Sequence, residues 1–318
     1  MSKLIKPAII AVALLSGIHP AVAATFTYTN IVDSSATYTQ PYGINNSGTI
    51  VGQVSGGSIT GQQTFQYSSG NFTIVTPPGA DTSYGVTWGA ISNNGEIVGN
   101  YVTTGTGLSK GFSDIGGTYS SFAVSGAALT EPTGVNNSGV IVGDYYKNSS
   151  YSGFIDTAGA ITTISKPTGA TFLWATGIND AGTVVGYYRD SSSITHGFTL
   201  SGSTFTSFDQ PGATGTEIIG INNSGNMLVS SSLGNFFYGG GSFTAISVPG
   251  SSDTYIRSLN DSNQIVGSYD TASCGSCGNI GFLATMNASG APEPGTIELL
   301  TGAALAAGAF VRRRTRVV

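Results

Sequence analysis

The sequence is built on one short motif that recurs six times. A polar turn followed by an apolar run first occurs as INNSGTIVG at residues 44–52. Counterparts follow at residues 91–99, 135–143, 178–186, 221–229 and 259–267. Measured between Gly48, Gly95, Gly139, Gly182, Gly225 and Asn263, the spacings are 47, 44, 43, 43 and 38 residues. Repeats of this length are typical of one supersecondary unit stacked many times.

Each unit contains four strand-like segments. The first ends at the Ile/Val-Asn pair, the second is the IVG segment, the third contains Gly-Phe, as at Gly197-Phe198, and the fourth follows a glycine turn, as at residues 204–213. β-Branched and aromatic residues bounded by Gly, Pro and Asn indicate strands. Four strands in about 43 residues is the size of a propeller blade. The sequence therefore predicts an all-β, six-bladed β-propeller over residues 25–287.

The ends of the repeat region predict how the ring closes. Residues 25–37 are similar to a fourth strand, whereas the last unit ends after its third strand, residues 281–287. The N-terminal strand is therefore expected to complete the last blade, which removes exposed sheet edges. A β-helix or elongated stack is the alternative, although its rungs are usually shorter.

The Asn-rich turns are predicted to join the first two strands of each blade. Asn and Gly tolerate positive φ, and Asn side chains bond the backbone within tight turns. Calcium binding is the alternative, but only Asp180 and Asp261 add a carboxylate beside an Asn. High-affinity calcium sites use several charged oxygens, so no metal site is predicted.

Both ends of the chain carry export and membrane patterns. Lys3, Lys6, an apolar stretch at residues 7–18 and Ala21-Val22-Ala23 predict a signal peptide over residues 1–23, cleaved before Ala24. Near the C-terminus, a linker at 288–296 precedes an apolar run and an Arg cluster, which together predict a membrane-anchor helix and basic tail over 297–318. The residues of this C-terminal pattern are Pro292, Glu293, Pro294, Arg312, Arg313, Arg314 and Arg316.

This C-terminal order resembles the PEP-CTERM sorting signal of Gram-negative bacteria. In that family the Pro-Glu-Pro motif, transmembrane helix and Arg cluster are recognised by an exosortase, a membrane cysteine transpeptidase. The resemblance implies an exosortase as partner, transient anchoring in the inner membrane and a biofilm-matrix context. Glu298 departs from the pattern, and an ordinary tail anchor is the alternative. Residues 40–285 resemble HAF-type extracellular repeats of secreted bacterial proteins, which implies no particular activity.

Composition argues against nucleic-acid binding. Charged residues make up only 8% of the chain, against roughly 25% in ordinary soluble domains. Residues 25–290 hold five basic and 14 acidic side chains, a net charge of −9. Phosphate recognition requires Lys and Arg, and no basic patch with interleaved aromatics occurs. Low charge with 47 glycines suits a secreted all-β protein.

Reactive side chains are few. Cys274 and Cys277 are the only cysteines and are predicted to form a small-loop disulfide after export. A zinc site would need two more ligands, and His196 is the only histidine outside the leader. No GxSxG motif accompanies His196, which is interpreted as a loop residue. No catalytic residue and no cofactor are predicted.

Three aspartates recur shortly after the second strand of their units: Asp144, Asp190 and Asp270. Such side chains either surround a pocket or solvate a loop, and the solvated loop is the favoured interpretation. An acid cluster with raised pKa values in the central channel would instead favour a glycan hydrolase or lyase.

Aromatic residues indicate where a ligand would bind. If strands run from inner to outer, the long, variable loops share one face, and the Asn-rich turns lie on the other. Flat rings with polar edges suit carbohydrate or protein surfaces, whereas packing between blades is the alternative. The candidate ligand-binding residues on and near the loop face are Tyr42, Tyr84, Trp88, Tyr145, Trp174, Tyr187, Arg189 and Tyr269.

Taken together, these features predict an exported, non-catalytic cell-surface or extracellular-matrix protein. Its loop face is the expected binding surface for exopolysaccharide or a protein partner. A propeller glycan hydrolase or lyase remains an alternative from another class. Ice or surface adhesion is a third, although the repeats are not built on the Thr ladders that would support it.

Overall fold

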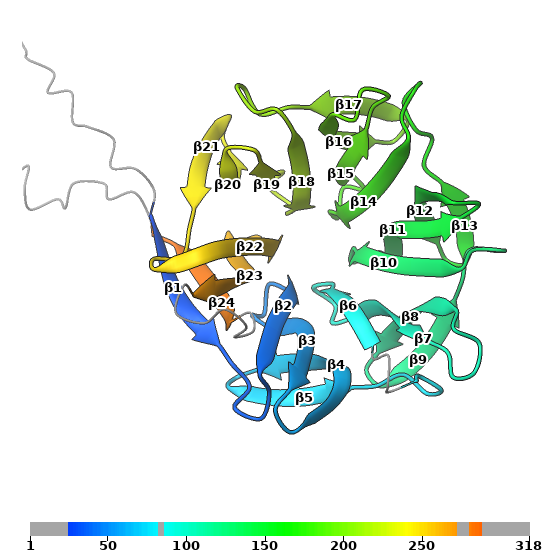
Figure 1. Ribbon diagram of the computed structural model, residues 1–318, viewed down its shortest axis with the longest axis vertical. Helices are drawn as coiled ribbons and strands as arrows, with labels where there is room; N and C mark the ends of the chain where they lie inside the picture. The colour runs from blue at the N-terminus through cyan, green and yellow to red at the C-terminus, as the bar shows by residue number, and fades with distance from the viewer. Residues whose placement is uncertain (1–24, 82–85, 272–279, 288–318) are drawn as a thin grey trace, which may run out of the picture. The chain divides into compact units, whose positions relative to one another are not determined.

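The computed structural model describes residues 25–81, 86–271 and 280–287, and one compact unit spans Phe26–Asn287. These residues form 24 strands, arranged as six four-stranded antiparallel sheets around a common centre (Figure 1). The prediction of an all-β, six-bladed propeller is therefore confirmed. Within these ranges no helix is suited to crossing a membrane. The predicted signal peptide and membrane anchor lie outside the described residues.

In five blades the chain order runs outward from the centre of the ring (Figure 1). The first three of these blades are β2 (Tyr38–Ile44), β3 (Ile50–Gly56), β4 (Ile59–Ser68) and β5 (Asn71–Val75); β6 (Val86–Ile91), β7 (Ile97–Val102), β8 (Ser109–Ile115) and β9 (Thr118–Phe122); and β10 (Leu129–Val135), β11 (Val140–Lys147), β12 (Ser150–Thr157) and β13 (Ala160–Thr163). Blades 4 and 5 are β14 (Phe172–Ile178), β15 (Val184–Arg189), β16 (Thr195–Ser201) and β17 (Thr204–Phe208); and β18 (Thr216–Ile221), β19 (Met227–Ser231), β20 (Gly234–Gly239) and β21 (Ser242–Ile246).

Blade 6 closes the ring with strands from both ends of the propeller. It consists of β22 (Ser251–Leu259), β23 (Gln264–Thr271), β24 (Ile280–Met286) and, outermost, β1 (Phe26–Ile31). Strand β1 pairs antiparallel with β24, so that Phe26 faces Met286 and Ile31 faces Gly281. The predicted closure by the N-terminal strand is confirmed.

The IVG and GF segments of the repeat form one packing arrangement. In blade 4, Gly186 lies directly opposite Phe198, whose side chain is fully buried. A Cβ on Gly186 would lie 2.0 Å from the carbonyl oxygen of Trp174 and 2.9 Å from Cε1 of Phe198. Glycine is therefore required where the inner strand and the phenylalanine ring both approach its backbone. The corresponding phenylalanines of blades 1, 2, 3 and 6 are also fully buried: Phe65, Phe112, Phe154 and Phe282.

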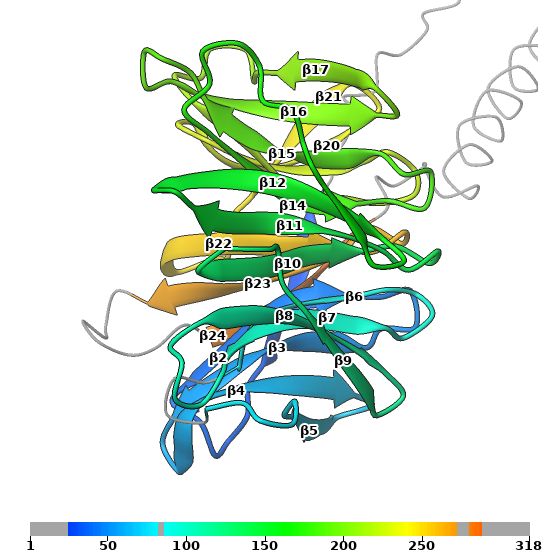
Figure 2. The same ribbon diagram turned by 90° about the vertical axis from the view of Figure 1, so that its right-hand side faces the viewer.

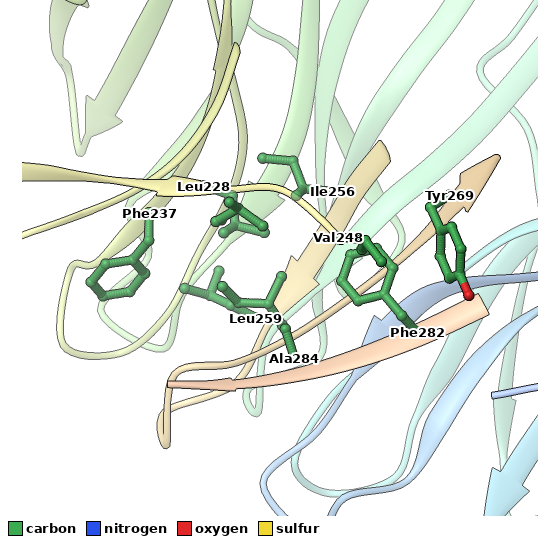
Figure 3. Close-up of a cluster of buried hydrophobic side chains, with 10 residues drawn as sticks. Leu228, Phe237, Val248, Ile256, Leu259, Tyr269, Phe282 and Ala284 are labelled. Atoms are coloured by element: carbon green, nitrogen blue, oxygen red, sulfur yellow. The ribbon is translucent and has the colours of Figure 1, made fainter. Parts of the chain in front are cut away.

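Apolar side chains fill the space between neighbouring blades. Figure 3 shows one such cluster, in which Leu228 and Phe237 of blade 5 meet Ile256, Leu259 and Phe282 of blade 6. All five are at most 6% exposed. Burying one side chain of this kind contributes about 1.5–3 kcal/mol, so each blade depends on its neighbours for its core.

In every blade except the second, the first polar residue of the turn is an asparagine with two roles, shown clearly by Asn136 in blade 3. Its Oδ1 accepts hydrogen bonds from the backbone N–H groups of Ser138 and Val140, both at 3.0 Å. These bonds close the predicted hairpin between β10 and β11, which is confirmed. Its Nδ2 donates to the carbonyl oxygen of Asn179 in blade 4, at 3.2 Å. This second role, between blades, was not predicted.

The next residue of each turn, together with Asn94 in blade 2, completes a ring of hydrogen bonds on one face of the propeller, here called the turn face. The backbone N–H donates to a side-chain oxygen of the following blade, as from Asn137 to Asp180 at 2.9 Å. The last bond runs from Asp261 to Asn46 at 2.9 Å and joins blade 6 to blade 1. The other four bonds are Asn46 to Asn93, Asn94 to Asn137, Asp180 to Asn223 and Asn223 to Asp261, at 2.7–3.2 Å.

We expect Asn136→Ser to destabilise the protein by about 1–2 kcal/mol, because a buried inter-blade hydrogen bond is lost while the turn remains capped. Blade 2 provides the template, since Ser92 occupies this position and its Oγ accepts the N–H of Glu96 at 3.1 Å. Urea unfolding measures the effect. Asn71→Ser, on an exposed outer turn, is the matched control; equal stability of the two variants would contradict the inter-blade role.

Candidate functional site

The inner strands of the six blades line the centre of the propeller. Because side chains alternate along a strand, two alternate positions of each inner strand are available to this channel. Figure 2 shows the ring from the side, with the strands running between its two faces. The face opposite the turn face, which carries the second-to-third and fourth-to-first loops, is here called the loop face.

Two cavities occupy this centre. The smaller, of about 90 Å³, is lined by the turn-face ring, including Asn137, Asp180 and Asp261. The larger, of about 330 Å³, is here called the channel pocket. Both cavities are bordered by Tyr42, Thr133, Thr176, Ile219 and Arg257. The channel pocket is also lined by Gly89, Glu131, Asp144, Tyr151, Trp174, Ala175, Tyr187 and Glu217.

Aromatic rings form a continuous row that begins in the channel pocket. The ring of Trp174 lies 5.3 Å from that of Tyr151 and 5.0 Å from that of Tyr187, both edge-on. Beyond the pocket, Phe172 lies 4.7 Å from Trp174, and Tyr146 lies 4.9 Å from Tyr151. All five side chains are half-buried, so their rings keep accessible surface. These five residues are here called the aromatic row.

Two carboxyl groups face each other across the wall of the channel pocket. Glu131 in β10 is the direct cross-strand partner of Asp144 in β11, and Asp144 is only 6% exposed. Burial, the negative charge of Glu131 and a hydrogen bond to Glu131 raise the pKa of Asp144 well above its ordinary value. Burial also raises the pKa of Glu131, although its hydrogen bond from Asp144 lowers it. Ionisation of both groups at once is therefore disfavoured, so the pair retains a proton to a higher pH than an isolated carboxyl group would.

Further charges surround the same space. Burial raises the pKa of Glu217, while the nearby Arg189 lowers it. Burial and the negative charges of Glu217 and Asp144 raise the pKa of Tyr187. The guanidinium Cζ of Arg257 lies 5.2 Å from the centre of the Tyr42 ring, a cation–π contact. The channel pocket thus combines three carboxyl groups, one guanidinium and four aromatic rings.

The structure brings three of the eight aromatic and basic candidates together, since Tyr42, Trp174 and Tyr187 all line the channel pocket. Arg189 is exposed and covers Phe172, with Cζ 4.9 Å from its ring centre. Tyr145 and Tyr269 do not line it.

These last two side chains make contacts within their own blades. The hydroxyl of Tyr145 is hydrogen-bonded to Thr163 at 2.9 Å. Tyr269 is 8% exposed and its hydroxyl donates to Asn30 at 3.1 Å. Tyr84 lies outside the described residues, and β6 contains Trp88, whose side chain is likewise not described.

The remaining predicted groups lie elsewhere. His196 belongs to strand β16, so its interpretation as a loop residue is wrong. Its Nδ1 lies 3.0 Å from Asp209, and its Nε2 lies 3.5 Å from Asp190. Asp270 accepts a hydrogen bond from Tyr255 at 3.4 Å. Within the described ranges, no group of three or more His, Cys, Asp or Glu is arranged to hold a metal ion. Cys274, Cys277 and the C-terminal sorting residues lie outside those ranges.

Sequence reasoning missed the charged wall of the channel pocket. The interpretation of Asp144 as a loop-solvating residue is wrong, because β11 continues to Lys147 and the Asp144 side chain is buried. Glu131, Tyr151, Glu217 and Arg257 were not singled out. A signal was present in the sequence. When the inner strands are aligned on their Asn-rich turns, Glu131 and Glu217 occupy the same position as Trp174, which was a candidate ligand-binding residue.

No family model matches the sequence, and no curated protein matches it. Several solved propellers are similar in fold. A gluconolactonase from Xanthomonas campestris is 15% identical over 85% of this chain and 98% of that chain, with a TM-score of 0.47. The β-propeller domain of the Trilobed protease from Pyrococcus furiosus is 10% identical over 81% and 100% of the two chains, with a TM-score of 0.48. The Hadza microbial sialidase Hz136 is 12% identical over 78% and 65%, with a TM-score of 0.47. At these identities the likeness concerns the fold alone.

The paired carboxyl groups predict a specific pH dependence of stability. Because the folded pKa of Asp144 is raised, the folded protein binds more protons than the unfolded chain between the ordinary and the raised pKa. Stability is therefore lost as pH rises through that window. Asp144→Asn removes this loss, and we expect the variant to be more stable than the wild type at pH 8 but not at pH 3. Urea unfolding of the wild type and the variant at pH 3 and at pH 8 measures the difference in their free energies of unfolding.

The exposed Asp253 supplies the control. Asp253→Asn is expected to leave the difference between pH 3 and pH 8 unchanged. An Asp144→Asn variant less stable than wild type at pH 8 would contradict the account of the pair.

Proposed function

We propose that this protein is an exported cell-envelope or extracellular-matrix component that binds carbohydrate in the channel pocket and does not transform it. The single observation that carries the proposal is the meeting of aromatic rings and hydrogen-bonding groups in one cavity. Trp174, Tyr187 and Tyr151 lie in ring contact beside Glu131 and the other charged residues that line the pocket.

The composition of the pocket matches the surface of a sugar. Sugar rings present flat C–H faces, which stack on aromatic side chains, and hydroxyl edges, which hydrogen-bond to carboxylates and guanidinium groups. A volume of about 330 Å³ lies within the range of roughly 300–1,000 Å³ typical of small-molecule sites. One saccharide unit can therefore stack on Trp174 while Glu217 and Arg257 bond its hydroxyl groups.

The aromatic row extends this site beyond a single sugar unit. Phe172 and Tyr146 continue the ring contacts outside the pocket, and Arg189 adds a cation at the edge over Phe172. Successive half-buried rings provide stacking positions for successive units of a polymer. The proposal therefore concerns a polysaccharide chain with one unit held in the pocket.

The cellular context is part of the same proposal. The Ala21-Val22-Ala23 pattern supports export, and the Pro292-Glu293-Pro294 motif with its Arg cluster supports sorting by an exosortase. In this proposal the propeller reaches the cell surface or the surrounding matrix, where polysaccharide is its ligand.

A glycan array followed by calorimetric titration with the full chain tests the binding proposal. We expect Trp174→Ala to weaken binding at least about tenfold, the effect of losing ~1.4 kcal/mol of stacking. Tyr119→Ala, on the outer strand β9, is the matched control and is expected to bind as the wild type does. Absence of any glycan ligand, or equal affinity of wild type and Trp174→Ala, would overturn the proposal.

A second candidate function is glycan cleavage, favoured by the raised pKa of Asp144, a property expected of a general acid. Retaining and inverting glycosidases place two carboxyl groups about 5–10 Å apart on either side of the bond. Glu131 and Asp144 are hydrogen-bonded to each other and are therefore too close to be that pair, so Glu217 would have to supply the second group. Chromatography of glycan ligands after incubation with the protein distinguishes cleavage from binding. New fragments that are absent with the Glu217→Gln variant support cleavage, whereas unchanged elution profiles support binding without cleavage.

A further inference from the structure

The repeat provides an internal comparison for the paired carboxyl groups. In every blade, one residue of the inner strand lies directly opposite one residue of the second strand at the same level of the channel. The six pairs are Gln40–Gln53, Thr87–Asn100, Glu131–Asp144, Trp174–Tyr187, Glu217–Ser230 and Tyr255–Ser268. Only blade 3 places two carboxyl groups against each other.

The fold itself does not require acids at this level. Blade 1 has the two amides Gln40 and Gln53 at the positions of Glu131 and Asp144. Like charges directly opposite on neighbouring strands are destabilising, and a buried carboxylate loses its hydration. The acidic pair in blade 3 therefore costs stability through repulsion and lost hydration, whereas the amide pair of blade 1 is uncharged and leaves only Nε2 of Gln53 buried without a hydrogen-bond partner. A local departure from the repeat that lowers stability is typical of a binding site, where a ligand supplies the compensating contacts.

The groups around the pair indicate the charge of that ligand. Three carboxyl groups line the channel pocket, and the two nearby guanidinium groups act elsewhere: Arg189 lowers the pKa of Glu217, and Arg257 lies against the ring of Tyr42. The negative charges of both Glu131 and Asp144 act on Tyr151, whose ring contacts Trp174. Carboxylates bordered by aromatic rings are the surroundings that favour an ammonium group, through charge-assisted hydrogen bonds and cation–π contact.

We propose that the channel pocket binds the free ammonium group of an amino sugar between Glu131 and Asp144, with the sugar ring stacked on Trp174. This inference rests on the carbohydrate-binding function proposed above and specifies the ligand class as a deacetylated hexosamine. An N-acetyl group in the same place has no charge and carries a methyl group that neither carboxyl group can solvate, so it is selected against.

Proton movement accompanies this binding. In the empty pocket burial and the second carboxyl group raise the pKa of Asp144, so the pair holds one proton up to a higher pH than an isolated carboxyl group does. An arriving ammonium group supplies hydrogen-bond donors and a positive charge, which together favour the ionised form of both carboxyls. The shared proton then leaves to the buffer, and no bond of the sugar is made or broken. At an acidic pH, where the sugar amine is already fully protonated, binding of the amino sugar is therefore coupled to proton release, whereas binding of a neutral sugar is not.

Calorimetric titration of the full chain tests the inference with two probes: a β-1,4-linked glucosamine tetramer and its fully N-acetylated counterpart. Repeating each titration at pH 5.5 in acetate and in MES, which differ in ionisation enthalpy, measures the protons released at a pH where the amines are protonated. We expect the glucosamine tetramer to bind at least about tenfold more tightly and to release protons, as charge-assisted contacts predict. The N-acetylated tetramer should show the same heat in both buffers.

Glu131→Gln reproduces the uncharged side chain that blade 1 carries as Gln40, so the fold should tolerate it. We expect this variant to lose both the preference for the free amine and the proton release while still binding the N-acetylated tetramer. Glu96→Gln is the matched control, because Glu96 follows the turn of blade 2 and accepts a hydrogen bond from Ser113 away from the pocket. It should behave as the wild type does.

The possible results separate the two proposals. Equal affinity for both tetramers, or tighter binding of the N-acetylated one, overturns the ammonium site and leaves carbohydrate binding in place. Preference for glucosamine that persists in Glu131→Gln also overturns it. Binding of neither tetramer while an array glycan binds overturns the amino-sugar assignment alone, whereas absence of any glycan binding overturns both.

Discussion

The closed ring of hydrogen bonds on the turn face is the constraint on which the rest of the structure depends. Each turn is bonded to the next blade through a backbone N–H and a side-chain oxygen, and Asp261 and Asn46 complete the circle over 215 residues of sequence. The pairing of β1 with β24 closes the same ring at its outer edge. Because both closures fix each blade against its neighbours, corresponding residues of the six inner strands meet at the same depth of the channel.

Because the six blades have nearly the same backbone, the functional site is defined by which side chains occupy corresponding positions. The backbone presents the same cross-strand pair of positions, one on the inner strand and one on the second strand, six times, and the repeat fills it differently each time: amides in blade 1, acids in blade 3, aromatic rings in blade 4. The turn face, where the copies agree, serves assembly. The channel pocket, where they differ, gathers charge and aromatic surface on one side. A buried acidic pair lowers stability, a cost that binding sites commonly bear and that uniform repeats avoid.

Local chemistry explains why so much of the fold could be predicted from the sequence. The spacing of the Asn-rich turns sets the number of blades, and the fourth-strand character of residues 25–37 predicts the closure. The second role of Asn136 could not be predicted, since its partner Asn179 lies 43 residues away and is adjacent only in the folded ring.

The site was predicted less well for a geometric reason. Alternation along a strand indicates which residues share a face, but it does not show which of the two faces lines the channel. A sequence pattern also does not show where a strand ends. Asp144 therefore resembled a loop residue, although β11 continues past it and buries it. Tyr145 and Tyr269 were grouped with Trp174 by residue type alone, whereas the fold directs them into their own blades.

The central claim is that one deviation from the repeat, the acidic pair of blade 3, defines what the propeller recognises. A crystal structure of the full chain with a glucosamine tetramer tests it most directly. The account predicts one unit in the channel pocket, its amine nitrogen within hydrogen-bonding distance of both Glu131 and Asp144 and its ring stacked on Trp174. A tetramer bound on another surface, or one whose pocket unit directs its amine away from this pair, would contradict it.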